Sequence, residues 1–198
     1  NVDSVYRYTA KGNLVAVVTD GTAVLGLGNI GAKASIPVME GKAVLFKRFG
    51  NVDAWPVPLE NVKTNNRTDV DKVVEAVKAI ACMYGGINLE DFAAPECFEV
   101  EDRLSEELDI PVFHDDQWGT AIIVLAGIKN YCLLADKSIK DLRIVINGAG
   151  AAGIRVADML KRAGAENIIM VDTKGVIHTK RDDLNQYKQK HAVETEKR

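Results

Sequence analysis

The segment from Leu142 to Asp172 constrains the fold more than any other part of this chain. The β-branched run LRIVIN at 142–147 leads directly into GAGAAG at 148–153, which matches GxGxxG and is followed by an amphipathic pattern over 154–163. The next apolar run ends at Asp172, roughly 20 positions beyond the last glycine, the spacing at which an acid meets the ribose hydroxyls of a dinucleotide. The glycines permit a tight turn that brings a pyrophosphate to the helix N-terminus. The segment therefore predicts the start of a Rossmann-type dinucleotide-binding domain.

Two pairs of adjacent acids follow short apolar runs in the middle of the chain. Glu90-Asp91 comes after GGINL at 85–89, and Asp115-Asp116 comes shortly after IPVF at 110–113. Both runs are typical of short buried strands, and ligands bind at the ends of strands in open α/β sheets. A divalent cation would offset the repulsion between such carboxylates, and oxygen ligands suit Mg²⁺ or Mn²⁺. Solvated acids that cap the strands are the alternative on the residues alone.

The first 46 residues contain a further glycine motif and a lysine of uncertain role. NLVAVVT at 13–19, a turn at Asp20-Gly21 and a second apolar run at 23–25 predict a hairpin or two sequential strands. GLGNIG at 26–31 also matches GxGxxG, but Pro37 should stop any helix after about six residues, which favours a glycine turn near a ligand. Lys42 precedes the apolar run 43–46; it could act as a base if desolvated or be held charged by nearby carboxylates, and a surface lysine is the plainest interpretation.

The remaining pattern predicts an α/β chain with two domains. We expect an extended connector at 53–59, a surface loop at 63–68, a helix over 69–84 capped by Thr68 or Asp69, and a buried linker helix over 119–134. An acidic amphipathic helix is expected over 95–108, with a solvated face that consists of Glu99, Glu101, Asp102, Glu106 and Glu107. His178 and His191 have no partners at metal-ligand spacing and are expected on the surface.

The domain division predicted from this pattern places an α/β substrate- and metal-binding domain at 1–117. An incomplete Rossmann-type domain follows at 118–198. Because the cofactor domain holds barely one βαβ unit, we expect the chain to be part of a longer protein.

Composition narrows the partners and the compartment. The net charge is −3, and no run of Lys or Arg is long enough to make a nucleic-acid or membrane footprint, so a small-molecule partner is expected. Cys82, Cys97 and Cys132 are widely spaced without a CxxC pair, which predicts neither a disulfide framework nor a zinc site. No apolar stretch reaches the length of a membrane span and no signal peptide is recognised, so a soluble cytoplasmic protein is expected.

Taken together, these segments resemble the malic enzymes, and specifically the shorter bacterial type. The matching segments are YTAKGNLVAV at 8–17, DGTAVLGLGNIG at 20–31, PVMEGK at 37–42, GINLED at 86–91, FHDDQ at 113–117 and GAGAA at 148–152. They follow the family's order from residue 6 to about residue 178, so the resemblance covers most of the chain.

The resemblance implies roles that the residues alone do not assign. Lys42 matches the family's general base, which takes the proton of the malate hydroxyl, and Asp115 matches a neighbouring catalytic-site acid. Asp115 is expected to pair with Lys42 and to hold the lysine protonated at rest. The three implied metal ligands are Glu90, Asp91 and Asp116. The implied cofactor loop consists of Gly148, Ala149, Gly150, Ala151 and Ala152. The implied reaction is oxidative decarboxylation of malate to pyruvate and CO₂ with hydride transfer to NAD or NADP, dependent on Mg²⁺ or Mn²⁺, in a homo-oligomer that is a dimer.

Three departures from the family pattern affect this expectation. The family's proton-donating tyrosine lies in a Tyr-Thr/Ser-Pro-Gly-Val-Ala motif upstream of residue 1, and Tyr8 belongs to a later segment. Ala23 stands where the larger malic enzymes have a substrate-binding arginine, which leaves the malate carboxylate partner unassigned. The rest of the cofactor domain is absent, so this chain alone is expected to turn over malate poorly.

Two other functions remain open from the sequence. One is a different metal-assisted hydroxy-acid dehydrogenase, and the other is a non-catalytic nucleotide-binding or regulatory module. The choice between NAD and NADP is also open, because Asp172 would repel a 2′-phosphate whereas Lys174 could compensate.

Overall fold

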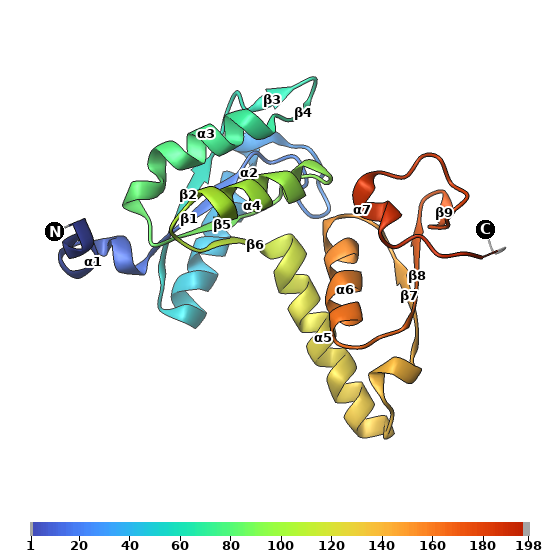
Figure 1. The fold of residues 1–198 in the computed structure, drawn as a ribbon. Helices are drawn as coiled ribbons and strands as arrows, with labels where there is room; N and C mark the ends of the chain where they lie inside the picture. Colours follow the sequence, from blue (N-terminus) through green and yellow to red (C-terminus); the bar gives the residue numbers. More distant parts are fainter. Residues whose placement is uncertain (1, 196–198) are drawn as a thin grey trace. The chain divides into compact units, whose positions relative to one another are not determined.

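The chain divides into two compact α/β units, Asn1–Asp115 and Asp116–Arg198 (Figure 1). The computed structural model describes residues 2–195. Each unit has its own sheet, and a two-stranded ribbon of β3 (Lys63–Thr64) and β4 (Arg67–Thr68) projects from the first unit. The α/β class predicted from the sequence is confirmed.

The sheet of the first unit consists of four parallel strands in the order β2-β1-β5-β6. Their bounds are β1 Leu14–Thr19, β2 Asp53–Pro58, β5 Gly86–Leu89 and β6 Val112–His114. Val18 pairs with Leu89, and Leu89 pairs with His114, so the three strands end in line. Because parallel strands share one carboxyl edge, the residues that follow these strands meet at that edge.

Three longer helices and several short ones complete the first unit. α2 spans Gly31–Leu45 and packs on β1 and β2. α3 spans Val70–Ile80, and α4 spans Glu96–Glu107. These two helices pack on each other, and α4 also contacts β6. The shorter elements are η1 Val2–Ser4, α1 Val5–Tyr8, η2 Ala10–Asn13, η3 Phe46–Gly50 and η4 Ala81–Met83. The Asp69 side chain caps α3 by accepting a hydrogen bond from the Lys72 backbone N–H, which confirms one of the two predicted caps.

The second unit contains the predicted strand–glycine loop–helix–strand sequence. β7 (Arg143–Asn147) pairs parallel with β8 (Asn167–Asp172), and α6 (Ala151–Arg162) connects them. β9 (Gly175–Val176) pairs antiparallel with β8. The remaining elements are α5 Asp115–Ala135, η5 Ile139–Asp141 and α7 Gln186–Gln189. The arrangement confirms the predicted βαβ start of a dinucleotide-binding fold.

The structure corrects two predictions about residues 23–45. Residues 23–25 form no strand; Val24 makes only an isolated bridge with Gly28. Pro37 does not stop a helix but lies inside α2, which continues to Leu45 and carries Lys42. Proline removes one backbone hydrogen bond. Burial of Ser35 and Met39 on the packed face offsets that loss, because tertiary packing supplies most helix stability in proteins.

The predicted connector at 53–59 is wrong, because this segment forms β2. The strand lies at the edge of the sheet and pairs only with β1 among the described residues. Pro56 and Pro58 cannot donate to a ladder, and an edge strand is where such residues are tolerated. The two prolines therefore mark the edge of the sheet rather than the absence of a strand.

Two polar residues expected on the surface are buried. Glu101 is 5% exposed on α4, whereas Glu99, Asp102, Glu106 and Glu107 are exposed as predicted. His191 is 4% exposed and contacts α6 side chains. Both predictions failed because the partner groups lie far along the sequence, where residue spacing does not reveal them.

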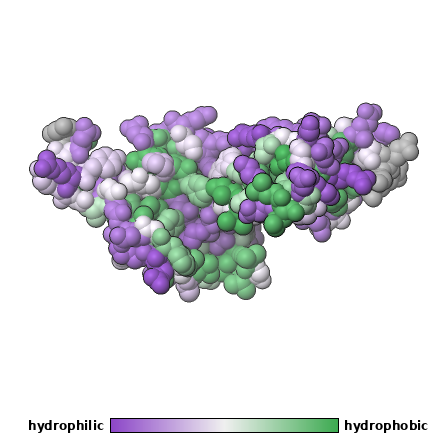
Figure 2. All heavy atoms as spheres, turned by 90° about the horizontal axis from the view of Figure 1, so that it is seen from below, coloured by the Kyte–Doolittle hydropathy of each residue, from purple (hydrophilic) through white to green (hydrophobic). Residues whose placement is uncertain are grey.

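The helix α5 is less buried than the sequence predicts. Only Gln117 and Ala121 are buried in this helix, while Ile123, Leu133 and Leu134 are 72%, 81% and 90% exposed. Figure 2, which views the molecule from below Figure 1, shows apolar residues (green) on the surface. Within residues 2–195, α5 is also long and apolar enough to cross a membrane by length and composition alone, which corrects the expectation that no stretch reaches that length.

Replacement of Gly21 by alanine should destabilise the first unit. Gly21 has φ +67°, and a Cβ there would lie 2.3 Å from the Gly31 carbonyl oxygen. Strain of this kind costs about 1–3 kcal/mol, so Gly21→Ala should lower the free energy of unfolding by at least that amount in urea titrations.

Gly127 in α5 provides the matched control, because a Cβ there meets no atom within 4 Å. Gly127→Ala should be neutral or stabilise the protein by about 0.5–1 kcal/mol. Equal losses at the two positions would contradict the steric argument.

Candidate active site

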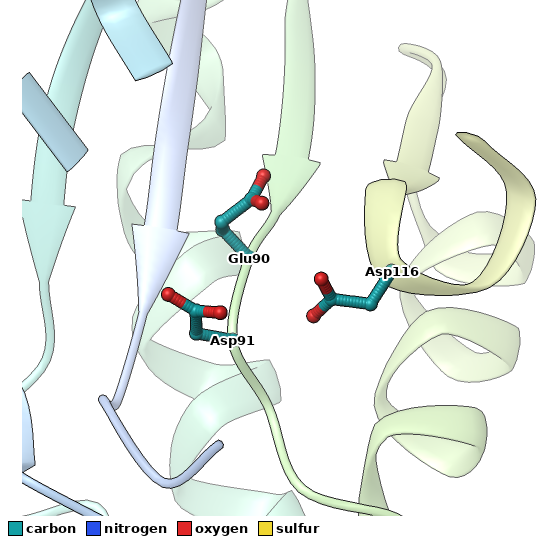
Figure 3. A group of neighbouring side chains, drawn as sticks. All are labelled: Glu90, Asp91 and Asp116. Carbon is teal, nitrogen blue, oxygen red and sulfur yellow. The ribbon is translucent and has the colours of Figure 1, made fainter. Parts of the chain in front are cut away.

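The carboxyl edge of the first sheet brings the predicted acids together. Glu90 and Asp91 directly follow β5, and Asp116 lies in the first turn of α5 directly after β6 (Figure 3). Each of the three offers a carboxylate oxygen, and these oxygens all lie within 4.8 Å of one another. Glu90 and Asp91 are 9% and 5% exposed. The three residues predicted as metal ligands therefore form one cluster.

Backbone hydrogen bonds hold the segment that carries Glu90 and Asp91. The Glu90 N–H donates to the Val18 carbonyl at 2.8 Å, and the Ala23 N–H donates to the Asp91 carbonyl at 2.9 Å. Asp91 has φ +58°, a left-handed conformation that aspartate tolerates better than most residues. The chain thus turns sharply at Asp91, and both carboxylates stay at the sheet edge.

Lys42 lies against the same acids. Its Nζ is 2.6 Å from Asp115 Oδ2 and 3.0 Å from Glu90 Oε2, and its side chain is 19% exposed. Burial disfavours the lysine charge, but the hydrogen bonds and charges of Asp115 and Glu90 outweigh this effect and raise the pKa of Lys42 above its ordinary value. Lys42 is therefore protonated in this state, and the interpretation of a surface lysine is wrong. The predicted pair with Asp115 is present, and the contact with Glu90 is new.

The donor set fits a hard divalent cation. Glu90, Asp91 and Asp116 provide only carboxylate oxygens, the ligands that Mg²⁺ and Mn²⁺ prefer. Glu90 Oε2 also accepts a hydrogen bond from the Asn88 side-chain amide at 2.8 Å, which orients this carboxylate. Three carboxylates this close together repel one another, and a cation between them would stabilise the cluster.

Two supports of this centre were missed by the sequence analysis. Glu101 accepts a hydrogen bond from the His114 N–H at 3.3 Å, immediately before the acids of α5. The signal that could have identified it is position, since Glu101 shares a helix face with buried Cys97 and Leu104.

The second support is a buried brace around Asp20. The Asp20 carboxylate is fully buried and accepts hydrogen bonds from the hydroxyls of Thr22 and Thr68, each at 2.6 Å. Thr22 in turn accepts from the Ala93 N–H at 2.9 Å. The brace therefore ties the loop after β1 to the segment that follows Asp91. The sequence predicts only a turn at Asp20-Gly21, because the two threonine partners are not apparent from its local pattern.

The glycine loop of the second unit has the features of a pyrophosphate cradle. Gly148 has φ +124°, and a Cβ on Gly153 would lie 2.0 Å from the Gly148 carbonyl oxygen. These two positions exclude side chains, so the loop turns tightly and α6 packs close to it. A Cβ on Gly150 meets nothing within 4 Å, so the loop surface at the start of α6 is open. Ala149, Ala151 and Ala152 complete a small-residue loop that suits a phosphate at a helix N-terminus.

Asp172 ends β8 at the predicted place, but its carboxylate is engaged by cations. Arg181 makes a bidentate contact with its two guanidinium nitrogens at 2.9 and 3.1 Å, and Lys188 Nζ lies 2.7 Å from Oδ2. The Arg181 hydrogen bond is the largest of the influences that hold the pKa of Asp172 well below its ordinary value, and Lys188 and the Lys174 N–H act in the same direction against burial. Neither Arg181 nor Lys188 was anticipated. A ribose at this position would meet a cluster of positively and negatively charged side chains rather than a single acid.

The two groups of residues are suited to complementary tasks. A hard cation held by such carboxylates would polarise an oxygen of a substrate, and a Rossmann-type loop would hold a dinucleotide that exchanges hydride. These features define the class of metal- and NAD(P)-dependent oxidoreductases.

Comparison with known proteins gives the family. The malic enzyme N-terminal domain matches residues 2–105, and the malic enzyme NAD-binding domain matches residues 118–198. The chain belongs to the malic enzyme family. It is 57% identical over 178 residues to the bifunctional malic/malolactic enzyme of Bacillus subtilis, with coverage of 90% of this chain and 42% of the relative.

Other relatives differ in their nicotinamide cofactor. The NADP-dependent malic enzyme of Rhizobium meliloti is 56% identical, with coverage of 98% of this chain and 25% of the relative. The crystal structure of the NAD-dependent malic enzyme of Thermotoga maritima is 44% identical with a TM-score of 0.89, and the match covers 96% of this chain and 50% of that one. This chain therefore spans half or less of the length of these relatives.

Removal of one acid should weaken metal binding. In the full-length protein, Asp91→Ala should weaken Mn²⁺ binding by at least about 10-fold, because loss of even an indirect partner of a ligand costs about 10–100-fold. Calorimetric titration would measure this. Asp109→Ala removes an exposed acid outside the cluster and should leave the affinity unchanged. Unchanged affinity in Asp91→Ala would exclude this acid as a ligand.

The ion pairs of Asp172 predict a specific pH dependence of stability. A carboxylate whose pKa is lower in the folded state stabilises the protein above its unfolded pKa, and the contribution disappears as pH falls towards the folded pKa. Asp172→Asn should therefore be less stable than the wild type from pH 7 down to about 5, with a difference that shrinks below about pH 4. Urea unfolding at several pH values would test this; a constant difference would contradict it.

Proposed function

We propose that the complete protein converts malate to pyruvate and CO₂ by oxidative decarboxylation, with NAD or NADP as hydride acceptor and Mg²⁺ or Mn²⁺ as cofactor. The observation that carries the proposal is the position of Lys42 Nζ, 2.6 Å from Asp115 and 3.0 Å from Glu90 of the carboxylate cluster. A proton-transferring group and a metal centre at one sheet edge suit a reaction that removes a hydroxyl proton and polarises the same oxygen. Family membership supports the same reaction.

The roles proposed for the residues follow from their contacts. Lys42 accepts the proton of the malate hydroxyl, and Asp115 holds and orients the lysine. Because both acids now stabilise the lysine proton, substrate must relieve this pairing before Lys42 acts as a base. Glu90, Asp91 and Asp116 hold the cation, which when bound supplies a Lewis acid for the oxygen on C2 of malate. Gly148–Ala152 and Asp172 hold the dinucleotide through its pyrophosphate and ribose.

Two rival functions have distinct outcomes in the same assay. Another metal-assisted hydroxy-acid dehydrogenase would reduce the nicotinamide with a different hydroxy acid and release no CO₂ from malate. A non-catalytic nucleotide-binding or regulatory module would turn over neither substrate, and its Mn²⁺ binding would survive Asp91→Ala and Asp116→Ala. Assay of the full-length protein with malate, Mn²⁺ and each nicotinamide cofactor separates the three and decides between NAD and NADP.

The proposed partners and location follow from composition and family. The family acts on small-molecule substrates; for this protein we propose malate and pyruvate, with neither nucleic acid nor membrane as a partner. A homodimer is proposed from the family resemblance. The cytoplasm is the proposed location, and the three free cysteines support a reducing compartment.

Substitution of the lysine provides the sharpest test of the mechanism. General acid–base catalysis contributes about 10²–10⁴-fold, so Lys42→Met should reduce kcat by that factor in the full-length enzyme. The matched control is Lys33→Met on the same helix, where the lysine is 80% exposed and pairs with Glu60. It should retain full activity. Wild-type kcat in Lys42→Met, measured by formation of the reduced nicotinamide, would exclude Lys42 as the base.

A further inference from the structure

Arg155 lies in the first turns of α6, the helix that follows the glycine loop, and contacts the beginning of α5. Its Nε donates to Gln117 Oε1 at 2.6 Å, and its guanidinium lies 4.8 Å from the centre of the Trp118 ring. The Arg155 side chain is 14% exposed, so these contacts are largely shielded from water. A charge-assisted hydrogen bond and a cation–π contact to consecutive residues hold one turn of helix at two points.

The residues that Arg155 holds directly follow a proposed metal ligand. Gln117 is fully buried and comes immediately after Asp116, so the two share the first turn of α5. A buried amide has a limited choice of positions, because it must keep its hydrogen bonds. The orientation of this turn, and with it the direction of the Asp116 carboxylate, therefore depends on the Gln117 contact.

A second set of contacts, within α6, also holds Arg155. Its Nη1 lies 3.4 Å from Asp158 Oδ2, one turn further along α6. The other oxygen of Asp158 lies 3.0 Å from Nε2 of His191, whose side chain is 3% exposed, and His191 Nδ1 lies 3.0 Å from Lys161 Nζ. The guanidinium is thus positioned between α5 and a polar network around buried His191, which limits its rotamers.

The helix α6, which carries Arg155, also packs closely against the glycine loop. The close approach of Gly153 to the Gly148 carbonyl leaves no room for α6 to shift relative to the loop. We infer that Arg155 is a positioning residue that fixes the α5 turn carrying Asp116 relative to the dinucleotide loop. The inference rests on the proposed function, in which that aspartate holds the cation and that loop holds the hydride acceptor.

Arginine is suited to this role in a way that lysine is not. Its planar guanidinium can donate from Nε to Gln117, stack on Trp118 and approach Asp158 at the same time, because its donors diverge in one plane. A lysine has one terminal nitrogen and could satisfy only part of this arrangement. Arg155→Lys should therefore restore part of what Arg155→Met loses.

The test compares variants of the full-length protein for Mn²⁺ affinity without nicotinamide cofactor, steady-state kinetics and thermal unfolding. Arg155→Met should weaken Mn²⁺ binding by about 10-fold, the size of effect expected from partners of metal ligands. It should lower kcat by about 10–100-fold while the KM for NAD or NADP changes by less than about 3-fold, because the loop itself remains intact. Arg162→Met removes an exposed arginine from the same helix and should change none of these quantities.

Gln117→Met is the second arm, because it removes the acceptor and keeps the arginine. It should reproduce the losses of Arg155→Met, and the double variant should be no worse than either single variant if the two residues act as one unit. A change in melting temperature with Mn²⁺ affinity and kcat within twofold of the wild type would overturn the inference. If Arg155→Met does not fold, normal Mn²⁺ affinity in Gln117→Met would overturn it equally.

The proposed function can fail independently of this inference. Wild-type protein that binds Mn²⁺ but releases no CO₂ from malate would refute the proposed reaction. The Mn²⁺ affinities of the Arg155 and Gln117 variants would still test the positioning role, because they require no turnover.

Discussion

Repulsion between carboxylates is the constraint around which the first unit is organised. Parallel pairing brings the ends of β5 and β6 into line, so the acids that follow these strands must share one sheet edge. Lys42 offsets part of that charge through Asp115 and Glu90. The remaining negative charge favours a divalent cation. The same arrangement that would destabilise the fold without compensation suits a metal ion.

The supporting residues explain why this edge keeps its geometry. Buried Asp20 binds two threonine hydroxyls and stabilises the loop after β1, while Glu101 accepts a hydrogen bond from the backbone just before the acids of α5. In the second unit, Arg155 restrains the turn that follows Asp116. Buried polar groups need satisfied partners, so each of these contacts restricts the chain to few conformations.

Much of the fold and most of the candidate site could be predicted from the sequence. The βαβ unit at 142–172, the helix capped by Asp69 and the strands before the acid pairs all have strong local patterns, and the structure confirms them. The predictions that failed concern Pro37 within α2, the prolines of β2 and the burial of Glu101 and His191. In each case, contacts with distant residues outweighed a local preference.

The sequence by itself determined which chemical groups are available: carboxylates at strand ends, one lysine among apolar residues, and a glycine loop before a helix. These features depend on neighbouring residues, and short-range sterics and hydrophobic periodicity specify them. Only the tertiary structure decided that Lys42 also contacts Glu90, that Arg181 and Lys188 engage Asp172, and that Arg155 reaches Gln117. The physical reason is that charges and hydrogen bonds act over a few ångströms in space, and folding brings together groups that are far apart along the chain.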